Sequence, residues 1–317
     1  MTPRLIQVSG VIVDLVYRVD TVPLPGQEAE VHSARLTPGG GFNAMHAARQ
    51  AGMVVGYAGT LGTGPMADLV ARALERDGIK VLRLRLASQD QGCCTVLVDR
   101  TGERTFIASV GAEGIVRAGD LAALRLGTRD WLLLSGYALG YPDSRDALGR
   151  WLEGLGPDTH LVFDPGPRVA VIPPQVLKAA MDTALWISAN AAEAAFLTAG
   201  LTPAAAAQRL AHDRPAQGGA VVRDGAQGCW FAPARGTAQH IAGYAVCAID
   251  TNGAGDAHIG HFIAALARGE DLATAARFAN IAAALSTTVE GPATAPTRER
   301  VLELITEDRP TKTKSGR

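Results

Sequence analysis

Short apolar runs alternate with longer amphipathic stretches along most of the chain, and turn residues such as Gly, Pro and Asp separate them. In the second half of the chain, the apolar run at 131–135 is followed by a helical pattern at 143–154. The strands predicted there are residues 131–135, 160–163, 184–188 and 219–223. This alternation predicts an α/β fold with a doubly wound, mostly parallel sheet, right-handed crossovers and helices on both faces.

The N-terminal part of the chain adds a second β-rich element. Residues 5–13 form an apolar, β-branched run ending on Asp14, which predicts a central strand with a carboxylate at its carboxyl end. Ligands bind at such ends in open α/β sheets. The runs 93–98 and 105–109 flank a Gly-containing turn and predict a hairpin. Because an isolated hairpin is marginal in water, we expect it to pair with a strand at 30–36 in a small separate sheet.

A glycine-rich helix start lies at residues 250–256, Asp-Thr-Asn-Gly-Ala-Gly-Asp. Gly253, Ala254 and Gly255 form a turn whose backbone N–H groups can approach a ligand closely, and the start of the following helix favours an anion. Asp256 comes next, where N–H groups and the helix dipole are expected to favour its ionised form, which suits a general base. A simple capping turn remains an equal alternative on this stretch alone.

A second glycine-rich helix start lies at residues 38–43, Pro-Gly-Gly-Gly-Phe-Asn. Three consecutive glycines cost backbone entropy, so close approach to a ligand or a hinge explains Gly40 and Gly41 better than an ordinary turn does. Asn43 could cap the helix or offer its amide to hydroxyl groups, and the pattern leaves both roles open.

Composition narrows the function classes. The 317 residues are 47% hydrophobic and 19% charged, with a formal net charge of −1, which is typical of a globular protein without a nucleic-acid or membrane surface. Anionic ligands must therefore be held by local N–H groups and individual basic residues. Four cysteines lack zinc spacing and predict reduced thiols in a cytoplasmic protein. We expect no signal peptide and no membrane span.

Several common sites are missing at the level of motifs. No G-x-x-x-x-G-K-[ST] or G-x-S-x-G sequence occurs, and no G-x-G-x-x-G follows the first predicted strand. His258 and His261 share a helix face, but no third metal ligand is apparent, so we expect surface or packing histidines.

Taken together, these motifs resemble the ribokinase-like (PfkB) family of ATP-dependent carbohydrate kinases over nearly the whole chain. Residues 39–52, preceded by 23–28, are similar to the N-terminal signature of the family, and residues 250–256 are similar to its C-terminal signature. Two signatures in the family order are more specific than either alone. Within the family, the chain is similar to uncharacterised bacterial sugar kinases.

The resemblance implies roles for the residues of both glycine-rich starts. Asp256 would be the base that activates a sugar hydroxyl, and the anion hole for the transferring γ-phosphate would be formed by Gly253, Ala254 and Gly255. Sugar hydroxyls would be held by Asp14, Gly40, Gly41 and Asn43.

The resemblance also implies ATP and Mg²⁺ as cofactors. Asn190 and Glu193 match an Asn-x-x-Glu segment that acts on Mg²⁺ and phosphate, largely through water. The nucleotide would be contacted by Asp224, Gly225, Gly228 and Asn280. The loop at Asp250, together with residues 290–292, resembles a monovalent-cation loop, which adds K⁺ to the expected cofactors.

The expected organisation is one domain over residues 1–317, with a lid formed by about 12–37 and 93–110 and a flexible basic tail at 308–317. The implied reaction is ATP-dependent phosphorylation of a hydroxymethyl group of a small sugar. A nucleoside kinase of the same fold is the alternative, and a non-catalytic sugar or nucleotide sensor is a third hypothesis. A homodimer through the lid is a further hypothesis, because lid strands can expose a sheet edge.

The chain departs from the family pattern at positions that bear on its substrate. Ile12 is apolar where ribokinases offer an amide, and Thr37-Pro38 stands where phosphosugar kinases carry a lysine. Arg223-Asp224-Gly225 stands where Thr or Lys is usual, which bears on the contact with phosphate. The arginines that could bind an anionic group are Arg35, Arg104 and Arg168.

Overall fold

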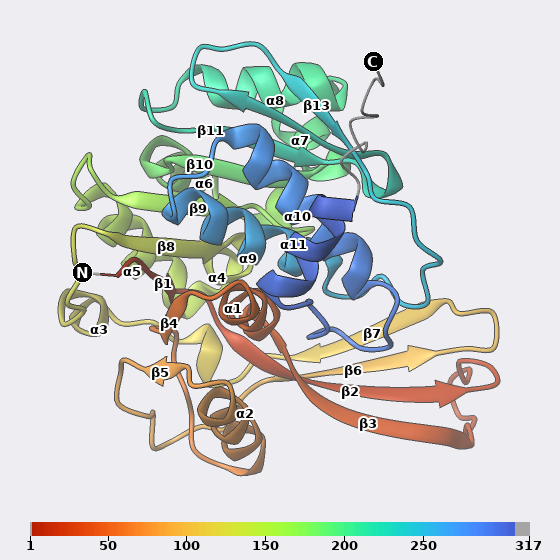
Figure 1. The fold of residues 1–317 in the computed structure, drawn as a ribbon. Helices are drawn as coiled ribbons and strands as arrows, with labels where there is room; N and C mark the ends of the chain where they lie inside the picture. The colour runs from red at the N-terminus through yellow and green to blue at the C-terminus, as the bar shows by residue number, and fades with distance from the viewer. Residues whose placement is uncertain (1, 308–317) are drawn as a thin grey trace, which may run out of the picture.

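A computed structural model describes residues 2–307, so the predicted tail at 308–317 lies outside the described residues. The body of the molecule is one nine-stranded sheet, in the order β13-β12-β11-β10-β9-β8-β1-β4-β5 (Figure 1). Its strands are β1 (Arg4–Gln7), β4 (Val54–Tyr57), β5 (Lys80–Val81), β8 (Asp130–Ser135), β9 (His160–Asp164), β10 (Trp186–Asn190), β11 (Gly219–Arg223), β12 (Gly228–Pro233) and β13 (Gln239–Ala242). All pair in parallel except β12 and β13, which add an antiparallel edge.

Helices cover both faces of this sheet, as the strand–helix alternation predicts. One face carries α1 (Gly41–Gln50), α2 (Pro65–Arg76), α9 (Ala254–Ala267) and α10 (Leu272–Ser286). The other carries α3 (Ala118–Ala122), α4 (Gly136–Gly140), α5 (Pro142–Glu153), α6 (Pro174–Thr183), α7 (Ala191–Leu197) and α8 (Pro203–His212). Helix α11 (Arg298–Glu307) packs on α10. The doubly wound α/β class is therefore confirmed.

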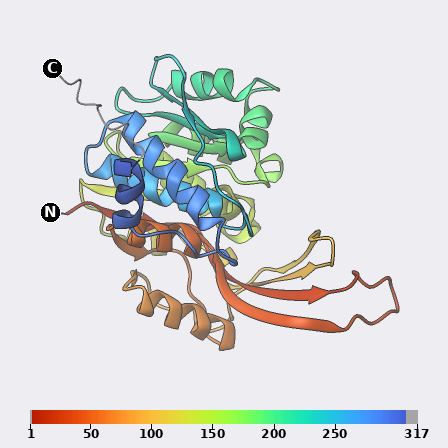
Figure 2. The ribbon, with the colours of Figure 1, turned by 45° about the vertical axis from the view of Figure 1, so that its right-hand side comes forward.

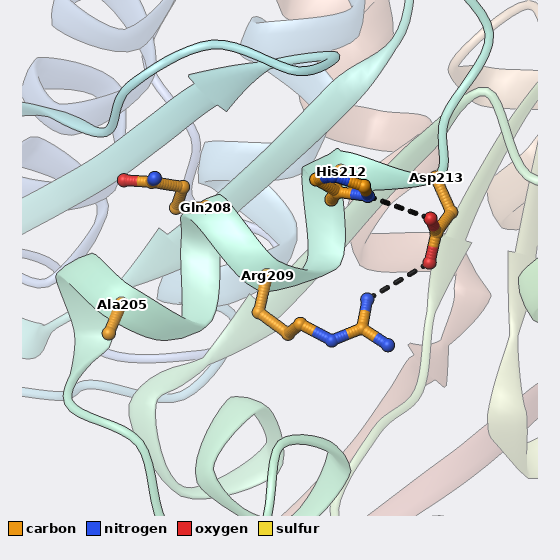
Figure 3. Close-up of a pocket in the computed structure, with 5 residues that line it drawn as sticks. All are labelled: Ala205, Gln208, Arg209, His212 and Asp213. Carbon is orange, nitrogen blue, oxygen red and sulfur yellow. Dashed lines mark hydrogen bonds and ion pairs between the residues drawn. The ribbon is translucent and has the colours of Figure 1, made fainter.

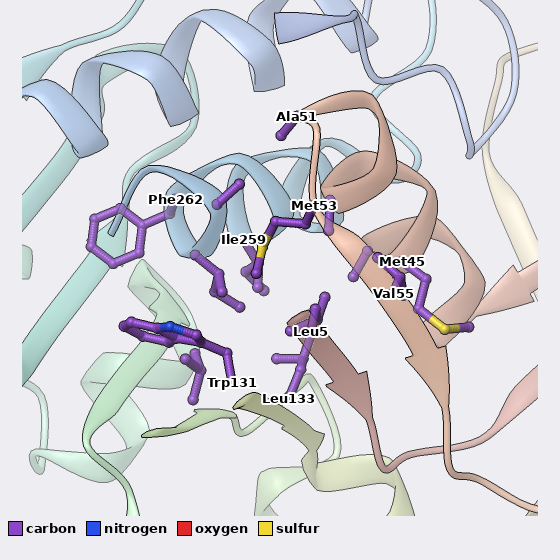
Figure 4. Close-up of a cluster of buried hydrophobic side chains, with 14 of the residues drawn as sticks. Leu5, Met45, Ala51, Met53, Val55, Trp131, Leu133, Ile259 and Phe262 are labelled. Atoms are coloured by element: carbon purple, nitrogen blue, oxygen red, sulfur yellow. The ribbon is translucent and has the colours of Figure 1, made fainter. Parts of the chain in front are cut away.

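The strands feed two separate cores because neighbouring side chains point to opposite faces. Leu5 and Trp131 pack under α1 and α9, whereas Ile6 and Leu132 pack against the helices of the other face. Figure 4 shows the first core, in which Phe262 of α9 lies close to the strand residues. The two buried layers explain why the strands are almost continuously apolar.

A separate four-stranded sheet, which we call the small sheet, projects from the body (Figure 2). It is formed by β2 (Val11–Val19), β3 (Val31–Gly40), β6 (Cys93–Val98) and β7 (Arg104–Ser109), in the order β3-β2-β6-β7. The hairpin is present, but its predicted pairing with the strand at 30–36 is wrong. Strand β2 lies between them, antiparallel to β3 and parallel to β6.

The prediction of one central strand at residues 5–13 is also wrong. The run divides at Ser9 and Gly10, so β1 lies in the main sheet, while β2 begins the small sheet and carries Asp14 within it. Gly10 lies against Glu113, and a Cβ there would be 2.5 Å from the Glu113 Cβ. An apolar run does not reveal where a chain leaves one sheet for another, because the buried strand β1 and the partly buried strand β2 are both rich in apolar residues.

Helix α9 is buried on every side from Ala257 to Ala265. It packs between α1 and α10 on one face of the main sheet. At the crossing with α1, a Cβ on Gly260 would lie 2.6 Å from the Ala47 Cβ and 2.7 Å from the Ala48 backbone nitrogen. The two glycine-rich helix starts therefore depend on one close helix contact for their relative position.

We expect Gly260→Ala to lower the free energy of unfolding by about 1–3 kcal/mol, because the added methyl group must push α1 and α9 apart. Gly149 in α5 is the matched control, since a Cβ there meets Val176 only at 3.7 Å, an ordinary contact. Gly149→Ala should be neutral or stabilising by up to about 1 kcal/mol. Urea unfolding measures both, and equal effects would contradict this account of the helix crossing.

Candidate active site

A cavity of about 1110 Å³ lies where the small sheet meets both glycine-rich helix starts and the carboxyl ends of β9, β10 and β11. Ten of the predicted site residues line it: Asp14, Gly40, Gly41, Asn43, Asn190, Glu193, Asp250, Gly253, Gly255 and Asp256. Five do not: Ala254, Asp224, Gly225, Gly228 and Asn280. The structure thus gathers the predicted substrate residues, the acidic residues and most of the glycine turn around one space.

The turn at the start of α9 requires glycine at its first position. Gly253 has a φ of 78°, and a Cβ on it would lie 1.9 Å from the carbonyl oxygen of Pro292. Ala254 is the first helical residue, so the N–H groups of Gly255 and Asp256 belong to the first turn, where a helix offers them no carbonyl partner. This is the geometry of an anion site.

Asp256 is half-buried at the end of this turn and faces the cavity. Burial raises the pKa of its carboxyl group to about 7, and the negative charge of Asp164 acts in the same direction. A hydrogen bond from Asn43 Nδ2 to Asp256 Oδ2, 3.3 Å long, and the charge of Arg223 lower the pKa but do not cancel the rise. The expectation that the turn favours the ionised form is therefore wrong, because burial is the largest influence on the pKa of Asp256 and raises it.

Asn43 does not cap α1. Of the two roles that the sequence leaves open, helix cap or amide donor to hydroxyl groups, only the second is compatible with this structure. The N-cap of α1 is Gly40, with a φ of 60° and no side-chain cap. Asp14 faces the same cavity from β2, and burial raises the pKa of its carboxyl group to about 6. A Cβ on Gly39 would lie 2.0 Å from Asp14 Oδ2, so this glycine makes room for the carboxylate.

Asp164 and Arg223 complete the site. The sequence assigned neither of them a role in the site, although Arg223 stood out as a departure from the family pattern. Both end strands of the main sheet, β9 and β11, and their side chains meet beside Glu193 of α7. Arg223 Nη2 lies 3.3 Å from Asp164 Oδ2 and 3.6 Å from Glu193 Oε2. One feature of the sequence could have identified them. Each residue ends a buried strand, and ligands bind at the carboxyl ends of parallel strands.

Mg²⁺ fits the donors that are present. Among residues 2–307 no group of three or more His, Cys, Asp or Glu side chains could hold a metal ion alone. Mg²⁺ usually keeps several waters and binds phosphates with one or two carboxylates, which Asp164 and Glu193 can supply. Both Glu193 carboxylate oxygens already accept hydrogen bonds from Asn190, at 2.8 and 2.9 Å, so contact through water suits this residue.

K⁺ does not fit the Asp250 carboxylate in this arrangement. Oδ1 accepts hydrogen bonds from Arg104 Nη2 at 2.6 Å and from the Asn252 backbone at 2.9 Å, and Oδ2 accepts one from the Gly291 backbone at 3.1 Å. Burial acts to raise the pKa of Asp250, but these hydrogen bonds outweigh it and hold the pKa below its usual value. Arg104 belongs to β7, so an arginine of the small sheet already supplies the positive charge.

The predicted nucleotide residues lie together beside the main cavity but outside it. The turn between β11 and β12 is closed by a hydrogen bond from the Asp224 backbone to the Gly228 carbonyl, 2.8 Å long. A Cβ on Gly228 would lie 2.1 Å from the Ile241 carbonyl oxygen. Asn280 Nδ2 donates to the carbonyls of Ile241 and Ala242, at 2.9 and 3.1 Å. Both residues therefore contact β13, and the Asn280 amide holds α10 to that strand.

The remaining candidates belong to packing or to the surface. Burial lowers the pKa of His258 to about 3 and that of His261 to about 4, so both are neutral packing residues inside α9. All four cysteines are free thiols. Figure 3 shows a second, shallow pocket on α8, lined by Ala205, Gln208, Arg209, His212 and Asp213. Its ion pairs are exposed, and none of its residues lines the main cavity.

The fold and the cavity together define a kinase of small molecules. The chain belongs to the pfkB family of carbohydrate kinases, whose sequence profile matches residues 4–299. It is 30% identical over 298 residues to the uncharacterised sugar kinase YegV of Escherichia coli, covering 93% of this chain and 92% of that one. It is also 30% identical over 307 residues to an ATP-dependent ribose-1-phosphate kinase of Halopiger xanaduensis, covering 96% and 98%.

A solved structure shows the same fold. The ribokinase of Arabidopsis thaliana, solved with ribose and ATP, matches with a TM-score of 0.80 at 22% identity, over 96% of this chain and 99% of that one. The class is thus a sugar or nucleoside kinase of an ATP-using family. No helix within residues 2–307 is both long and apolar enough to cross a membrane.

We expect Arg104→Gln to open the Asp250 carboxylate to a monovalent cation. KCl, compared with tetramethylammonium chloride at equal ionic strength, should then raise the melting temperature of the variant but not that of the parent chain. Arg100, an exposed arginine in the turn of the same hairpin, provides the control substitution Arg100→Gln. A parent chain that K⁺ itself stabilises would show that Arg104 does not occupy the cation site.

Proposed function

We propose that this protein transfers the γ-phosphate of ATP to a hydroxymethyl group of a small sugar, with Asp256 as the base. The observation that carries the proposal is the placement of the Asp256 carboxylate directly after the glycine turn at the start of α9, facing a cavity it shares with Asp14 and Asn43. A phosphoryl acceptor held by these two side chains would present its hydroxyl to Asp256.

The electrostatics support this role for Asp256. A general base works best when its pKa lies near the working pH, and burial raises the pKa of Asp256 to about 7. Phosphoryl transfer otherwise needs mainly positioning and charge stabilisation. The N–H groups of Gly253, Ala254 and Gly255 would form the anion hole, and Mg²⁺ would neutralise developing charge on the phosphates.

The nucleotide is proposed to bind next to the β11–β12 turn. Asp224, Gly225, Gly228 and Asn280 border that region from β11 to α10, and Asn190 and Glu193 would act on Mg²⁺ and phosphate through water. The small sheet would be a lid, because Arg18 and Arg104 already pair with Glu290 and Asp250 of the body at 2.7 and 2.6 Å. A closed lid excludes water, which otherwise competes as an acceptor.

A nucleoside kinase is the second candidate, and one observation favours it. Tyr137, Val96 and Phe106 line the cavity and offer apolar surface against which a base could pack. A non-catalytic sensor is disfavoured, because a sensor needs no base with a pKa near 7.

A screen of sugars and nucleosides by thermal shift, with and without ATP and Mg²⁺, would identify the acceptor, since a ligand at 100 times its Kd stabilises by about 2.7 kcal/mol. Coupled ADP release then tests each hit. We expect Asp256→Asn to lower kcat about 10²–10⁴-fold while the acceptor still shifts the melting temperature. Sugar-dependent ADP release that survives in this variant would refute the assignment of the base.

A homodimer through the lid is the proposed assembly. Phe106 and Ile107 on the edge strand β7 are 62% and 60% exposed, which leaves an apolar edge available for pairing. We expect sedimentation at micromolar concentration to give a dimer, and Ile107→Lys to give a monomer. Gln239 of β13, an edge strand of the main sheet, provides the control Gln239→Lys. A parent chain that sediments only as a monomer would contradict the assembly.

A further inference from the structure

Arg223 is held in place by three side chains at the carboxyl end of the main sheet. Nη1 donates a hydrogen bond to Ser188 Oγ at 2.6 Å, and Nη2 faces Asp164 at 3.3 Å and Glu193 at 3.6 Å. The side chain is only 13% exposed, yet it lines the cavity. A guanidinium group fixed in this way loses little conformational freedom when it binds a ligand.

The fixed guanidinium lies against the glycine turn of α9. A Cβ on Gly255 would be 3.6 Å from Arg223 Nε and 3.8 Å from both Cζ and Nη2, so only the missing side chain separates the two groups. The hydrogen bonds to Ser188 and Asp164 come from Nη1 and Nη2. A ligand atom bound by the N–H groups of the turn therefore comes within reach of the positive charge beside Gly255.

Among the arginines that line the cavity, Arg223 is the one whose guanidinium lies against Gly255. Arg18 and Arg35 face Glu290, and Arg104 faces Asp250, all at the junction with the small sheet. Arg168 is exposed on the cavity wall. Because the chain has a net charge of −1, an anion at the α9 turn depends on local donors, and Arg223 is placed to be the charged one.

We infer that Arg223 is a catalytic residue that binds the transferring phosphoryl group together with the N–H groups of the α9 turn. The inference rests on the proposed function. In the step it serves, the acceptor hydroxyl oxygen forms a bond to the γ-phosphorus and its proton passes to Asp256. The bond between that phosphorus and the β–γ bridging oxygen breaks, and the electron pair leaves with ADP. Arg223 stabilises the charge on the equatorial oxygens of the group in transit.

A structural role alone makes a different prediction. If Arg223 only neutralised Asp164 and Glu193, its loss would lower stability and weaken all nucleotides alike. If it binds the transferring group, its loss weakens the triphosphate and slows turnover, and leaves AMP binding intact. The planar guanidinium group also matters. Lysine at position 223 would keep the positive charge, but it could not donate two parallel hydrogen bonds to one phosphoryl group.

The test compares the parent chain with Arg223→Gln, Arg223→Lys and Arg223→Ala by calorimetric binding of AMP, ADP and a non-hydrolysable ATP analogue with Mg²⁺, and by ADP release. We expect Arg223→Gln to lower kcat about 10²–10³-fold and analogue affinity about tenfold, with AMP affinity within twofold. Arg223→Lys should recover part of the binding, and guanidinium ion should raise turnover of Arg223→Ala. Arg209→Gln on the exposed surface of α8 is the control and should match the parent chain.

Two results would overturn the inference. One is turnover and analogue affinity of Arg223→Gln within threefold of the parent chain. The other is an equal loss for AMP, ADP and the analogue together with a lower melting temperature, which indicates a structural role. Failure of the proposed function itself would look different, because the parent chain would then neither bind the analogue nor release ADP with any acceptor.

Discussion

The burial of one carboxyl group at the first turn of α9 is the constraint around which the site is organised. Asp256 must stay close to the N–H groups of that turn, yet its charge is costly there, and the pKa of about 7 expresses this cost. Gly253 fixes the turn against Pro292, and the crossing at Gly260 fixes α9 against α1 and so brings Asn43 to the carboxylate. Gly253 and Gly260 therefore together set the position of the Asp256 carboxylate relative to Asn43.

The charges of the cavity are arranged as internal pairs at its two ends. At the junction with the small sheet, Arg18 and Arg104 meet Glu290 and Asp250. At the carboxyl ends of the strands, Arg223 meets Asp164 and Glu193. A protein with a net charge of −1 can in this way hold a polyanionic nucleotide without a basic surface, because each arginine is oriented by a carboxylate before the ligand arrives.

Local features of the site could be predicted from the sequence, whereas features that depend on tertiary contacts could not. Both glycine-rich helix starts were visible, because positive φ angles and close approach demand glycine at Gly40 and Gly253. The alternation of strands and helices gave the parallel sheet. The edge strands β12 and β13, the division of residues 5–13 between two sheets and the pairing of β2 with β6 were missed, since each depends on partners far away in the chain. The pKa of Asp256 was predicted in the wrong direction for the same reason.

The pH dependence of kcat/KM for the identified acceptor tests the central claim most directly. A base with a raised pKa is ionised above that pKa, so kcat/KM should be constant above about pH 7 and fall tenfold per unit below it. The Asn43 hydrogen bond lowers the pKa of Asp256, so Asn43→Ala should move this limb to higher pH. A profile that is flat from pH 5.5 to 9, or a limb that Asn43→Ala leaves in place, would contradict the assignment of Asp256 as the base.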